Sequence, residues 1–254
     1  MRIITANVNG IRSAASKGFF DWMARQRADI VCLQETKCHR AQLDRSHFPR
    51  GWHAHYNCAE SKGYSGVAIY AKREPDSVLE HLGWDEFDRE GRYIEARYGD
   101  LSVVSLYLPS GSSGETRQAF KYRVLDWLAP HLEAWRTSGR HYVLCGDWNI
   151  AHRNVDLKNW RSNQKNSGFL PEERAWLDRV FAPDAWLDAY RALKPDAIEY
   201  TWWSNRGRAR ENNVGWRIDY HVVTPTLRDA LRAVSIYRKR WFSDHAPLTV
   251  EYDL

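Results

Sequence analysis

Residues 2–37, RIITANVNGIRSAASKGFFDWMARQRADIVCLQETK, contain the pattern that decides the fold class. Two short apolar runs, residues 2–6 and 29–33, predict buried strands. Between them, apolar side chains recur at helical spacing over residues 16–27, which predicts an amphipathic helix with Ser16 as its N-cap. This strand–helix–strand opening indicates an α/β layer arrangement.

Polar side chains follow both of these strands, and the same happens at three later places. The five segments are Asn7-Val8-Asn9-Gly10, Gln34-Glu35-Thr36-Lys37, Gly146-Asp147-Trp148-Asn149, Arg217-Ile218-Asp219-Tyr220 and Ser243-Asp244-His245. If the strands converge at one edge of a sheet, carboxylates, amides and one imidazole gather in a single pocket. Such a pocket suits a hard divalent cation and phosphate chemistry.

The rest of the chain alternates strand-like and helical patterns. Expected strands cover residues 52–57, 65–71, 93–98, 101–108, 141–145, 199–203, 216–224, 232–237 and 248–252. A long helix is expected over residues 115–135, and Pro171 opens another. Residues 151–168 form a long polar segment, which is typical of a functional loop. Pattern alone predicts an α+β protein with mixed sheets, about ten to twelve strands and about four helices.

Composition favours one domain over residues 1–254, because no Pro/Gly/Ser-rich or single-charge tract divides the chain. The net charge of +5 suits a polyanionic partner around an acidic centre. The four cysteines are not clustered, which makes zinc improbable and indicates a reducing compartment. No apolar run approaches about 20 residues and the first strand leaves no room for a signal peptide, so we expect a cytoplasmic protein with no membrane segment.

In kind and order, the five segments resemble the exonuclease III family of abasic-site (AP) endonucleases, within the DNase I-like metallophosphoesterases. The resemblance extends to Tyr107-Leu108-Pro109-Ser110-Gly111, Ser167-Gly168-Phe169 and residues 213–220, and covers the chain from Arg2 to about Thr249. It implies a four-layer α/β sandwich, with two packed mixed β-sheets flanked by helices. The site would lie at one edge, where loops from both sheets meet.

Glu35 is the best candidate metal ligand, because Mg²⁺ prefers oxygen ligands and needs only one or two carboxylates. On that motif alone, a Glu that caps a turn or pairs with Lys37 is the alternative. The resemblance implies Mg²⁺, for which Mn²⁺ can substitute. The candidate metal-binding residues are Asn7, Glu35, Asp147, Asn149, Asp244 and His245.

Asp147 and Asn149 lie at i and i+2, so they point the same way at a strand end. The carboxylate could activate a water or hold a metal, and an ordinary polar turn is the alternative. The resemblance pairs Asp219 with His245, an arrangement that fixes the imidazole tautomer. It also makes Tyr107 a residue of the active site, whose phenol could donate to the scissile phosphate. The alternative is a tyrosine at the protein surface with a solvated hydroxyl. The candidate catalytic residues are Tyr107, Asp147, Asn149, Asp219 and His245.

A third group of residues is expected to contact DNA: Asn9, Asn163, Asn166, Gly168, Trp203 and Trp216. The resemblance matches the asparagines to a phosphate-binding loop and the tryptophans to a pocket for a flipped-out baseless sugar. An apolar pocket of limited size would admit deoxyribose and exclude a normal nucleotide. For the basic residues nearby, contact with DNA and plain solvated charge remain equally open.

Together these features predict a Mg²⁺-dependent DNA-repair nuclease that cuts duplex DNA 5′ to abasic sites and also trims blocked 3′ ends. It would act as a monomer. A second hypothesis is a 3′→5′ exodeoxyribonuclease or 3′-phosphatase with weak abasic-site cutting. A catalytically dead DNA-damage binding module is a third, and the intact polar set argues against it. The Asn-rich basic loop argues against a fourth, a phospholipid or inositol phosphate hydrolase.

Overall fold

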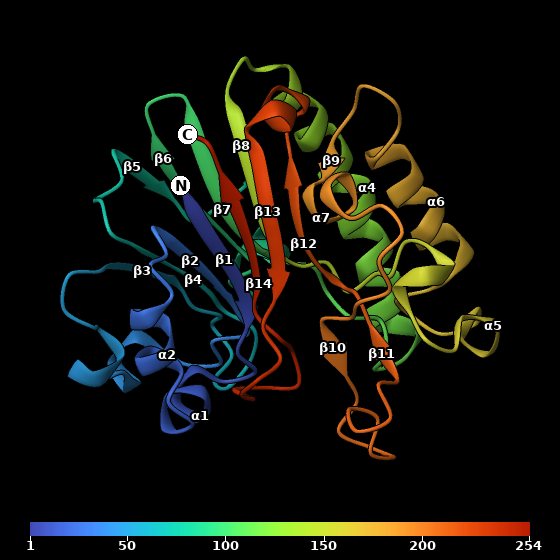
Figure 1. Ribbon diagram of the computed structural model, residues 1–254, viewed down its shortest axis with the longest axis horizontal. Coiled ribbons are helices and arrows are strands. Elements are labelled where there is room, and N and C mark those ends of the chain that lie inside the picture. The colour runs from blue at the N-terminus through green and yellow to red at the C-terminus, as the bar shows by residue number, and fades with distance from the viewer.

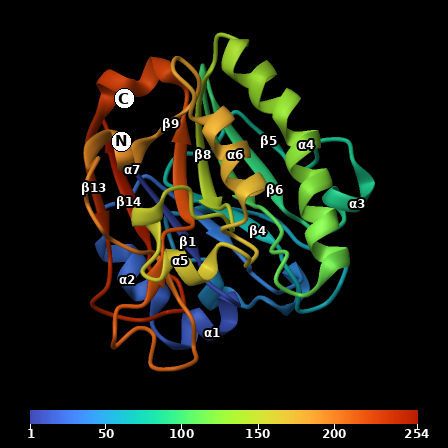
Figure 2. The ribbon, with the colours of Figure 1, turned by 90° about the vertical axis from the view of Figure 1, so that its right-hand side faces the viewer.

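The computed structural model describes residues 1–254 as two six-stranded sheets packed face to face, with helices on their outer faces (Figure 1, Figure 2). In spatial order, the first sheet is β13 (Leu231–Ile236), β14 (Leu248–Tyr252), β1 (Arg2–Asn7), β2 (Ile30–Gln34), β4 (Val67–Ala71) and β3 (His53–Asn57). The second is β5 (Ser77–Leu79), β6 (Tyr93–Tyr98), β7 (Leu101–Tyr107), β8 (His141–Asp147), β12 (Asp219–Val223) and β9 (Leu187–Asp188). The predicted four-layer α/β sandwich is confirmed.

Helices and short turns complete the two outer layers. The helices are α1 (Ile11–Ser16), α2 (Phe19–Arg25), α3 (Asp85–Asp88), α4 (Glu115–Thr137), α5 (Trp160–Asn163), α6 (Pro171–Val180) and α7 (Ala189–Leu193). Short 3₁₀ segments cover Arg40–Gln42, Arg45–His47, Asn154–Asp156 and Pro225–Ala230. A small hairpin of β10 (Trp202–Trp203) and β11 (Gly215–Trp216) stands apart from both sheets. No helix combines the length and the apolar character needed to cross a membrane.

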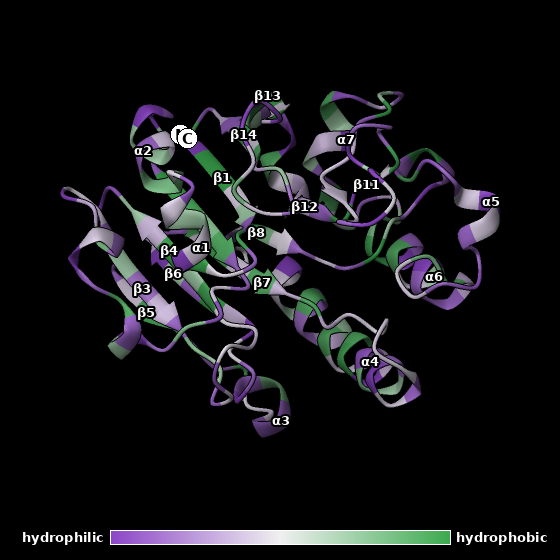
Figure 3. Ribbon diagram, turned by 90° about the horizontal axis from the view of Figure 1, so that it is seen from below, coloured by the Kyte–Doolittle hydropathy of each residue, from purple (hydrophilic) through white to green (hydrophobic).

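Three apolar clusters hold the layers together. The cluster between the sheets combines side chains such as Ile3 and Val67 of the first sheet with Val103 and Val143 of the second. The other two clusters pack α1 and α2 on the first sheet, and α4 and α6 on the second. Each fully buried aliphatic side chain contributes about 1.5–3 kcal/mol, so the interior fixes the relative position of the two sheets. Figure 3, seen from below, shows hydrophobic strands enclosed by more hydrophilic helices and loops.

Strand direction brings the polar strand ends to one edge. β1 and β2 are parallel, with Asn7 opposite Gln34, and β7 and β8 are parallel, with Tyr107 opposite Asp147. β12 runs antiparallel to β8, so it begins at the same edge, with Asp219 opposite Asp147. All of these ends lie at the lower edge in Figure 1. Parallel pairing therefore achieves the convergence that the sequence predicted.

The single helix predicted over residues 16–27 is wrong. The structure has α1 and α2, separated at Gly18, whose φ of +81° is left-handed and breaks the helical path. Ser16 does not cap a helix, because it ends α1 and its hydroxyl donates to the Ser13 carbonyl at 2.8 Å. The apolar stripe of the prediction is nevertheless buried, on α2.

The strand predicted over residues 216–224 is also wrong, because it divides into β11 and β12, which belong to different sheets. The division falls at Arg217, whose fully buried guanidinium turns inward. It donates to Asp156 Oδ1 and to Asp188 Oδ2, each at 2.7 Å. Arg191 contacts the same Asp156 carboxylate. This buried ion cluster ties the long polar loop to the second sheet.

The Asp156 carboxylate should dominate the acid sensitivity of this region. Burial alone would raise the pKa of Asp156, but Arg217 and Arg191 outweigh it and lower the pKa to about 2. A carboxyl whose folded-state pKa lies below its ordinary value of 3.8 stabilises the protein above that value. The contribution is lost as the pH falls through the folded-state pKa.

We therefore expect Asp156→Asn to lower the free energy of unfolding at pH 7 by about 3–5 kcal/mol, because two buried guanidinium groups lose their counter-charge. The difference in the free energy of unfolding between the variant and the unmodified protein should decrease by about 2 kcal/mol between pH 5 and pH 2. Urea unfolding followed by tryptophan fluorescence measures both quantities. Glu86→Gln is the control, since it breaks an exposed pair with Arg123 and should cost less than about 1 kcal/mol. If the difference in the free energy of unfolding does not change with pH, the lowered pKa of Asp156 is contradicted.

Candidate active site

Three strand-end side chains form the centre of the site. Glu35 follows β2, Asp147 ends β8, and His245 precedes β14. One ligand atom from each of the three lies within 4.8 Å of the other two. All three were named from the sequence, and they come from both sheets. Two carboxylates and an imidazole at this spacing can surround a single cation.

Asn7 connects the two carboxylates. Its side-chain Nδ2 donates to Glu35 Oε1 at 2.7 Å and to Asp147 Oδ2 at 2.9 Å. Its Oδ1 accepts the backbone N–H of Asn9 at 3.0 Å. Asn7 is 1% exposed, so the amide lies beneath the carboxylates. Its oxygen is already engaged within the protein, which places Asn7 as a support of the cluster.

Glu35 carries a second partner in addition to Asn7. Lys37 Nζ lies 2.7 Å from Glu35 Oε2. Burial alone would raise the pKa of Glu35, but Lys37 and Asn7 lower it below its ordinary value. Glu35 has a φ of +51°, a left-handed backbone that is uncommon outside glycine and that clusters at functional sites. The salt bridge with Lys37 and a ligand role are compatible, because each carboxylate oxygen has two lone pairs and Glu35 Oε1 accepts only the Asn7 amide.

Asp147 and Asn149 lie together, as their spacing predicted. Asp147 Oδ1 accepts the backbone N–H of Asn149 at 2.9 Å, and the Asn149 side chain donates to the Leu108 carbonyl at 2.9 Å. Burial raises the pKa of Asp147 to about 7, with His245 opposing the shift and Asp219 and Glu35 adding to it. A carboxylate with a raised pKa is a better proton acceptor at neutral pH.

Asp219 orients His245. The Nδ1 atom of His245 lies 2.9 Å from Asp219 Oδ2, and its Nε2 faces Asp147 Oδ2 at 3.8 Å. Burial alone would lower the pKa of His245, but Asp219 and Asp147 raise it to about 10. At neutral pH the ring is thus an imidazolium that can donate from Nε2. The other Asp219 oxygen, Oδ1, is buried without a hydrogen-bond partner.

Tyr107 closes one side of the cluster, opposite Asp147 on the neighbouring strand. The buried guanidinium of Arg92 lies 4.6 Å from the centre of its ring and donates to its carbonyl at 3.0 Å. Burial raises the pKa of Tyr107 well above its ordinary value, and the charge of Glu35 adds to this shift. The phenol therefore keeps its proton and can donate it in a hydrogen bond.

A cleft with a volume of about 1030 Å³ is lined by Glu35, Tyr107, Asp147, Asn149 and His245. The loop that contains Asn163, Asn166 and Gly168 lines the cleft. Trp202 and Trp216 also line it, and Trp216 lies next to the loop, since it forms a bridge with Leu157. Asp244 also lines the cleft, whereas Asn7 and Asn9, which was expected to contact DNA, do not line it. The structure thus gathers the predicted DNA-contact loop and the predicted polar set in one cleft.

Trp203 does not line the cleft, so its expected position is corrected here. It is 2% exposed, packs in a small apolar cluster with Tyr200 and Ala246, and donates from Nε1 to Asn213 at 3.2 Å. Trp202 takes its place, directly opposite Trp216 in the β10–β11 pairing. Successive residues of a strand point to opposite faces, so this pairing register is the signal that separates the two tryptophans.

Gly168 brings the loop against the cluster. Its φ is +91°, and a Cβ there would lie 3.0 Å from the Asn149 carbonyl oxygen and 3.3 Å from the Trp216 ring. A fully buried ion pair holds the same region, since Lys121 Nζ lies 2.6 Å from Glu173 and donates to the Asn149 carbonyl at 2.8 Å. Glu173 in turn accepts the Gly168 N–H at 2.6 Å. Sequence reasoning missed this pair, because a lysine in an amphipathic helix normally indicates the exposed face.

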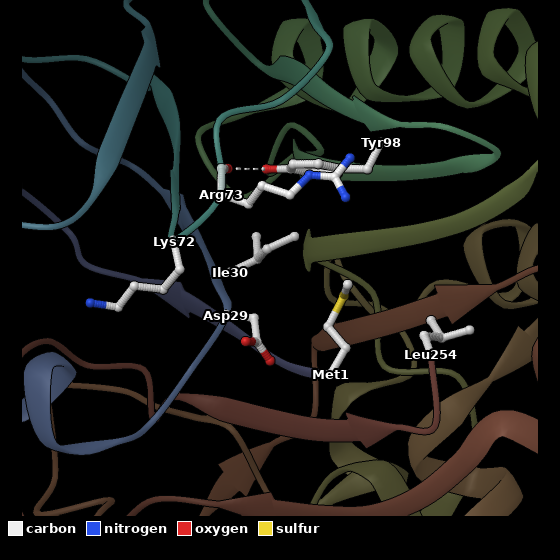
Figure 4. A pocket seen from close by; sticks show the side chains of 7 residues that line it. All are labelled: Met1, Asp29, Ile30, Lys72, Arg73, Tyr98 and Leu254. Carbon is white, nitrogen blue, oxygen red and sulfur yellow. Dashed lines mark hydrogen bonds between the residues drawn. The ribbon is translucent and has the colours of Figure 1, made fainter.

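A smaller hollow of about 290 Å³ lies at the opposite ends of the strands (Figure 4). It is lined by Met1, Asp29, Ile30, Lys72, Arg73, Tyr98 and Leu254. The Tyr98 hydroxyl donates to the Arg73 carbonyl at 3.4 Å. The residues of the carboxylate–imidazole cluster are absent from its lining and belong to the larger cleft.

Comparison with known proteins agrees with this geometry. The profile of the Endonuclease/Exonuclease/phosphatase family matches residues 4–245. An exodeoxyribonuclease of Bacillus subtilis is 37% identical, over 98% of both chains. A DNA-(apurinic or apyrimidinic site) endonuclease of Dictyostelium discoideum is 35% identical over 100% of this chain and 71% of its own length. The structure of an AP endonuclease from Archaeoglobus fulgidus superimposes with a TM-score of 0.90 at 29% identity, covering 100% of both chains. The chain therefore belongs to the Endonuclease/Exonuclease/phosphatase family, within its branch of AP endonucleases and exodeoxyribonucleases, and is a hydrolytic nuclease.

Proposed function

We propose that this nuclease is a Mg²⁺-dependent DNA-repair enzyme that hydrolyses the phosphodiester 5′ to abasic sites in duplex DNA and leaves a 3′-hydroxyl. It also trims and cleans blocked 3′ ends. The observation that carries the proposal is the position of the Glu35–Asp147–His245 cluster. It lies in a cleft that is also lined by an Asn-rich loop and two tryptophans. We further propose that residues 1–254 act as one domain, as a monomer, in the cytoplasm, where four free cysteines agree with a reducing environment.

The donor set suits a hard divalent cation. Glu35 and Asp147 offer carboxylate oxygens, and the His245 imidazolium lies within 4.8 Å of both as a hydrogen-bond donor. We assign Glu35 as the residue that would hold Mg²⁺, with Mn²⁺ as a substitute, and Asp147, Asn7, Asn149 and Asp244 as the groups around it. When bound, the cation neutralises phosphate charge and stabilises the departing oxyanion.

The protein's own residues then provide the proton transfers. Asp147 accepts a proton from the attacking water, since its raised pKa keeps it basic near neutral pH. Asn7 and Asn149 hold the Asp147 carboxylate in place through side-chain and backbone N–H groups. The His245 imidazolium, fixed by Asp219, donates from Nε2 to a phosphate oxygen. The protonated Tyr107 phenol offers a second donor to the phosphate.

Selection of damaged DNA falls to two groups of residues that line the cleft. Asn163, Asn166 and Lys165 of the loop suit phosphate contacts. Trp202, Trp216 and Ile218 form an apolar surface for a baseless sugar. A missing base lowers the cost of turning a nucleotide out of the helix. Trp202 thus replaces Trp203 in the proposed sugar pocket.

A second candidate keeps the same residues and changes the main substrate. The Bacillus relative is named an exodeoxyribonuclease, which supports a 3′→5′ exonuclease or 3′-phosphatase with weak abasic-site cutting. Both hypotheses use the same phosphate chemistry, so only the ratio of the two rates separates them. A catalytically dead damage-binding module disagrees with the complete carboxylate–imidazole cluster.

The decisive test uses a labelled duplex with one abasic analogue beside an undamaged nicked duplex, both resolved on a denaturing gel. We expect cutting 5′ to the abasic site, no cutting after chelation, and recovery with Mg²⁺ or Mn²⁺. Glu35→Gln should raise the Mg²⁺ concentration needed for half-maximal rate, because it removes a charged oxygen ligand. Full activity after exhaustive chelation would refute the metal assignment. Faster trimming of the nicked duplex would favour the exonuclease hypothesis.

Asp147→Asn and His245→Ala should each lower turnover by roughly 10²-fold or more, the scale of a lost proton acceptor or oxyanion donor. The affinity for DNA should change far less. The double variant should be no worse than the poorer single variant, because both groups serve one transition state. Asp44→Asn is the control, since it disrupts a carboxylate–imidazole pair with His47 outside the cleft. Near-normal turnover in either single variant would remove that residue from the mechanism.

Lys165 should contribute to the salt dependence of DNA binding. Lys165 lines the cleft, and Lys158 of the same loop does not. Lys165→Ala should flatten the log–log plot of binding constant against salt by about one unit of slope, whereas Lys158→Ala should not. Binding of an uncleavable duplex, measured by fluorescence anisotropy, gives both slopes. Equal slopes for the two variants would mean that the loop is merely solvated.

A further inference from the structure

Trp202 lines the cleft and also pairs with the segment that contains His245. On one side it pairs with Trp216 in the β10–β11 hairpin. On the other side it forms an antiparallel bridge with His245. Two backbone bonds frame this bridge, from Trp203 N–H to the Asp244 carbonyl at 3.1 Å and from Ala246 N–H to the Thr201 carbonyl at 2.7 Å. Movement of Trp202 is therefore transmitted directly to residues 244–246.

The Trp202 side chain makes a second connection through Asp244. Its indole Nε1 donates to Asp244 Oδ2 at 3.0 Å. The other oxygen, Oδ1, accepts the side-chain amide of Asn9 at 2.8 Å. Both Asp244 oxygens thus have a directional donor, and hydrogen bonds of this kind fix the plane of a carboxylate.

The chain of contacts continues to Glu35. The Asn9 side-chain oxygen accepts a hydrogen bond from Lys37 Nζ. The same ammonium pairs with Glu35 Oε2 at 2.7 Å. Trp202, Asp244, Asn9, Lys37 and Glu35 therefore form an unbroken polar path from the cleft wall to the cluster. The facing wall residue, Trp216, has no hydrogen bond from its indole nitrogen, so only one of the two tryptophans is connected in this way.

We propose that Trp202 is a positioning residue that couples the sugar pocket to the cation site: its indole N–H orients Asp244 and, through Asn9 and Lys37, Glu35. The inference rests on the proposed function, because it concerns the pocket and the cation site assigned there. A group that enters the pocket and presses on Trp202 changes the orientation of Asp244 and His245. By linkage, occupancy of the pocket and affinity for the cation then change each other by the same factor.

The test replaces the indole by a ring without the N–H. Calorimetric titration of the DNA-free protein with Mn²⁺ should show about tenfold weaker binding for Trp202→Phe, the scale of a lost orienting partner in a metal site. Trp216→Phe is the matched control, because it alters the same wall without removing a protein hydrogen bond. It should bind Mn²⁺ within twofold of the unmodified protein. Unchanged Mn²⁺ affinity in folded Trp202→Phe would overturn the proposal.

Asn9→Gly provides a second variant if Trp202→Phe does not fold. Glycine accepts the φ of +43° at this position and removes the amide that orients Asp244. Weaker Mn²⁺ binding supports the path, and unchanged binding refutes it. The unmodified protein separates this result from the proposed function. If it neither binds Mn²⁺ nor cuts the abasic duplex, the proposed function fails. If it does both and the variants bind as it does, only the coupling through Trp202 fails.

Discussion

One amide group joins the two sheets at the active edge. The Asn7 Nδ2 donates to Glu35 of the first sheet and to Asp147 of the second. Both bonds are possible only if the sheets pack to within a fraction of an ångström, which the apolar cluster between them enforces. The amide also reduces the repulsion between two buried carboxylates, because each N–H faces one of them. The candidate active site depends on this alignment of β1, β2 and β8.

The cluster is nevertheless costly to assemble. Glu35, Asp147 and Asp219 bring like charges together, and burial raises the pKa of Asp147 to about 7. The positive charges of Lys37 and His245 compensate for part of this repulsion. Left-handed backbone at Glu35 and Asn149 adds strain at the same place. Such a site is stable only because the interior elsewhere is well packed, the usual relation between strained functional edges and the core that supports them.

The sequence predicted the parts of this structure that depend on local pattern. Apolar runs located the central strands, and the polar residues after them located Glu35, Asp147, Asp219 and His245. It failed where a tertiary contact overrides the pattern. The left-handed backbone at Gly18 ends the helix although the apolar side chains around it are spaced for a continuous one. Arg217 interrupts a strand because its buried guanidinium donates to two carboxylates that are distant in the sequence. The Trp202–Trp203 ambiguity has the same origin, since two adjacent tryptophans look alike until the register with Trp216 is known.

The carboxylate–imidazole cluster and the residues proposed to select the substrate lie on different elements of the fold. The cluster lies at strand ends of the two sheets, whereas the other lining residues of the cleft lie on a loop and a small hairpin outside the sheets. These elements are held by buried ion pairs, Lys121–Glu173 on the loop side and Arg217–Asp156 where the loop meets β12. A buried ion pair holds the two segments that it joins in place, and loss of one partner is strongly destabilising because it leaves an unpaired buried charge. Loop length and wall side chains can therefore change the preferred substrate while the hydrolytic centre stays constant. The names of relatives agree with this arrangement, since both exodeoxyribonuclease and AP endonuclease occur among proteins similar to this chain.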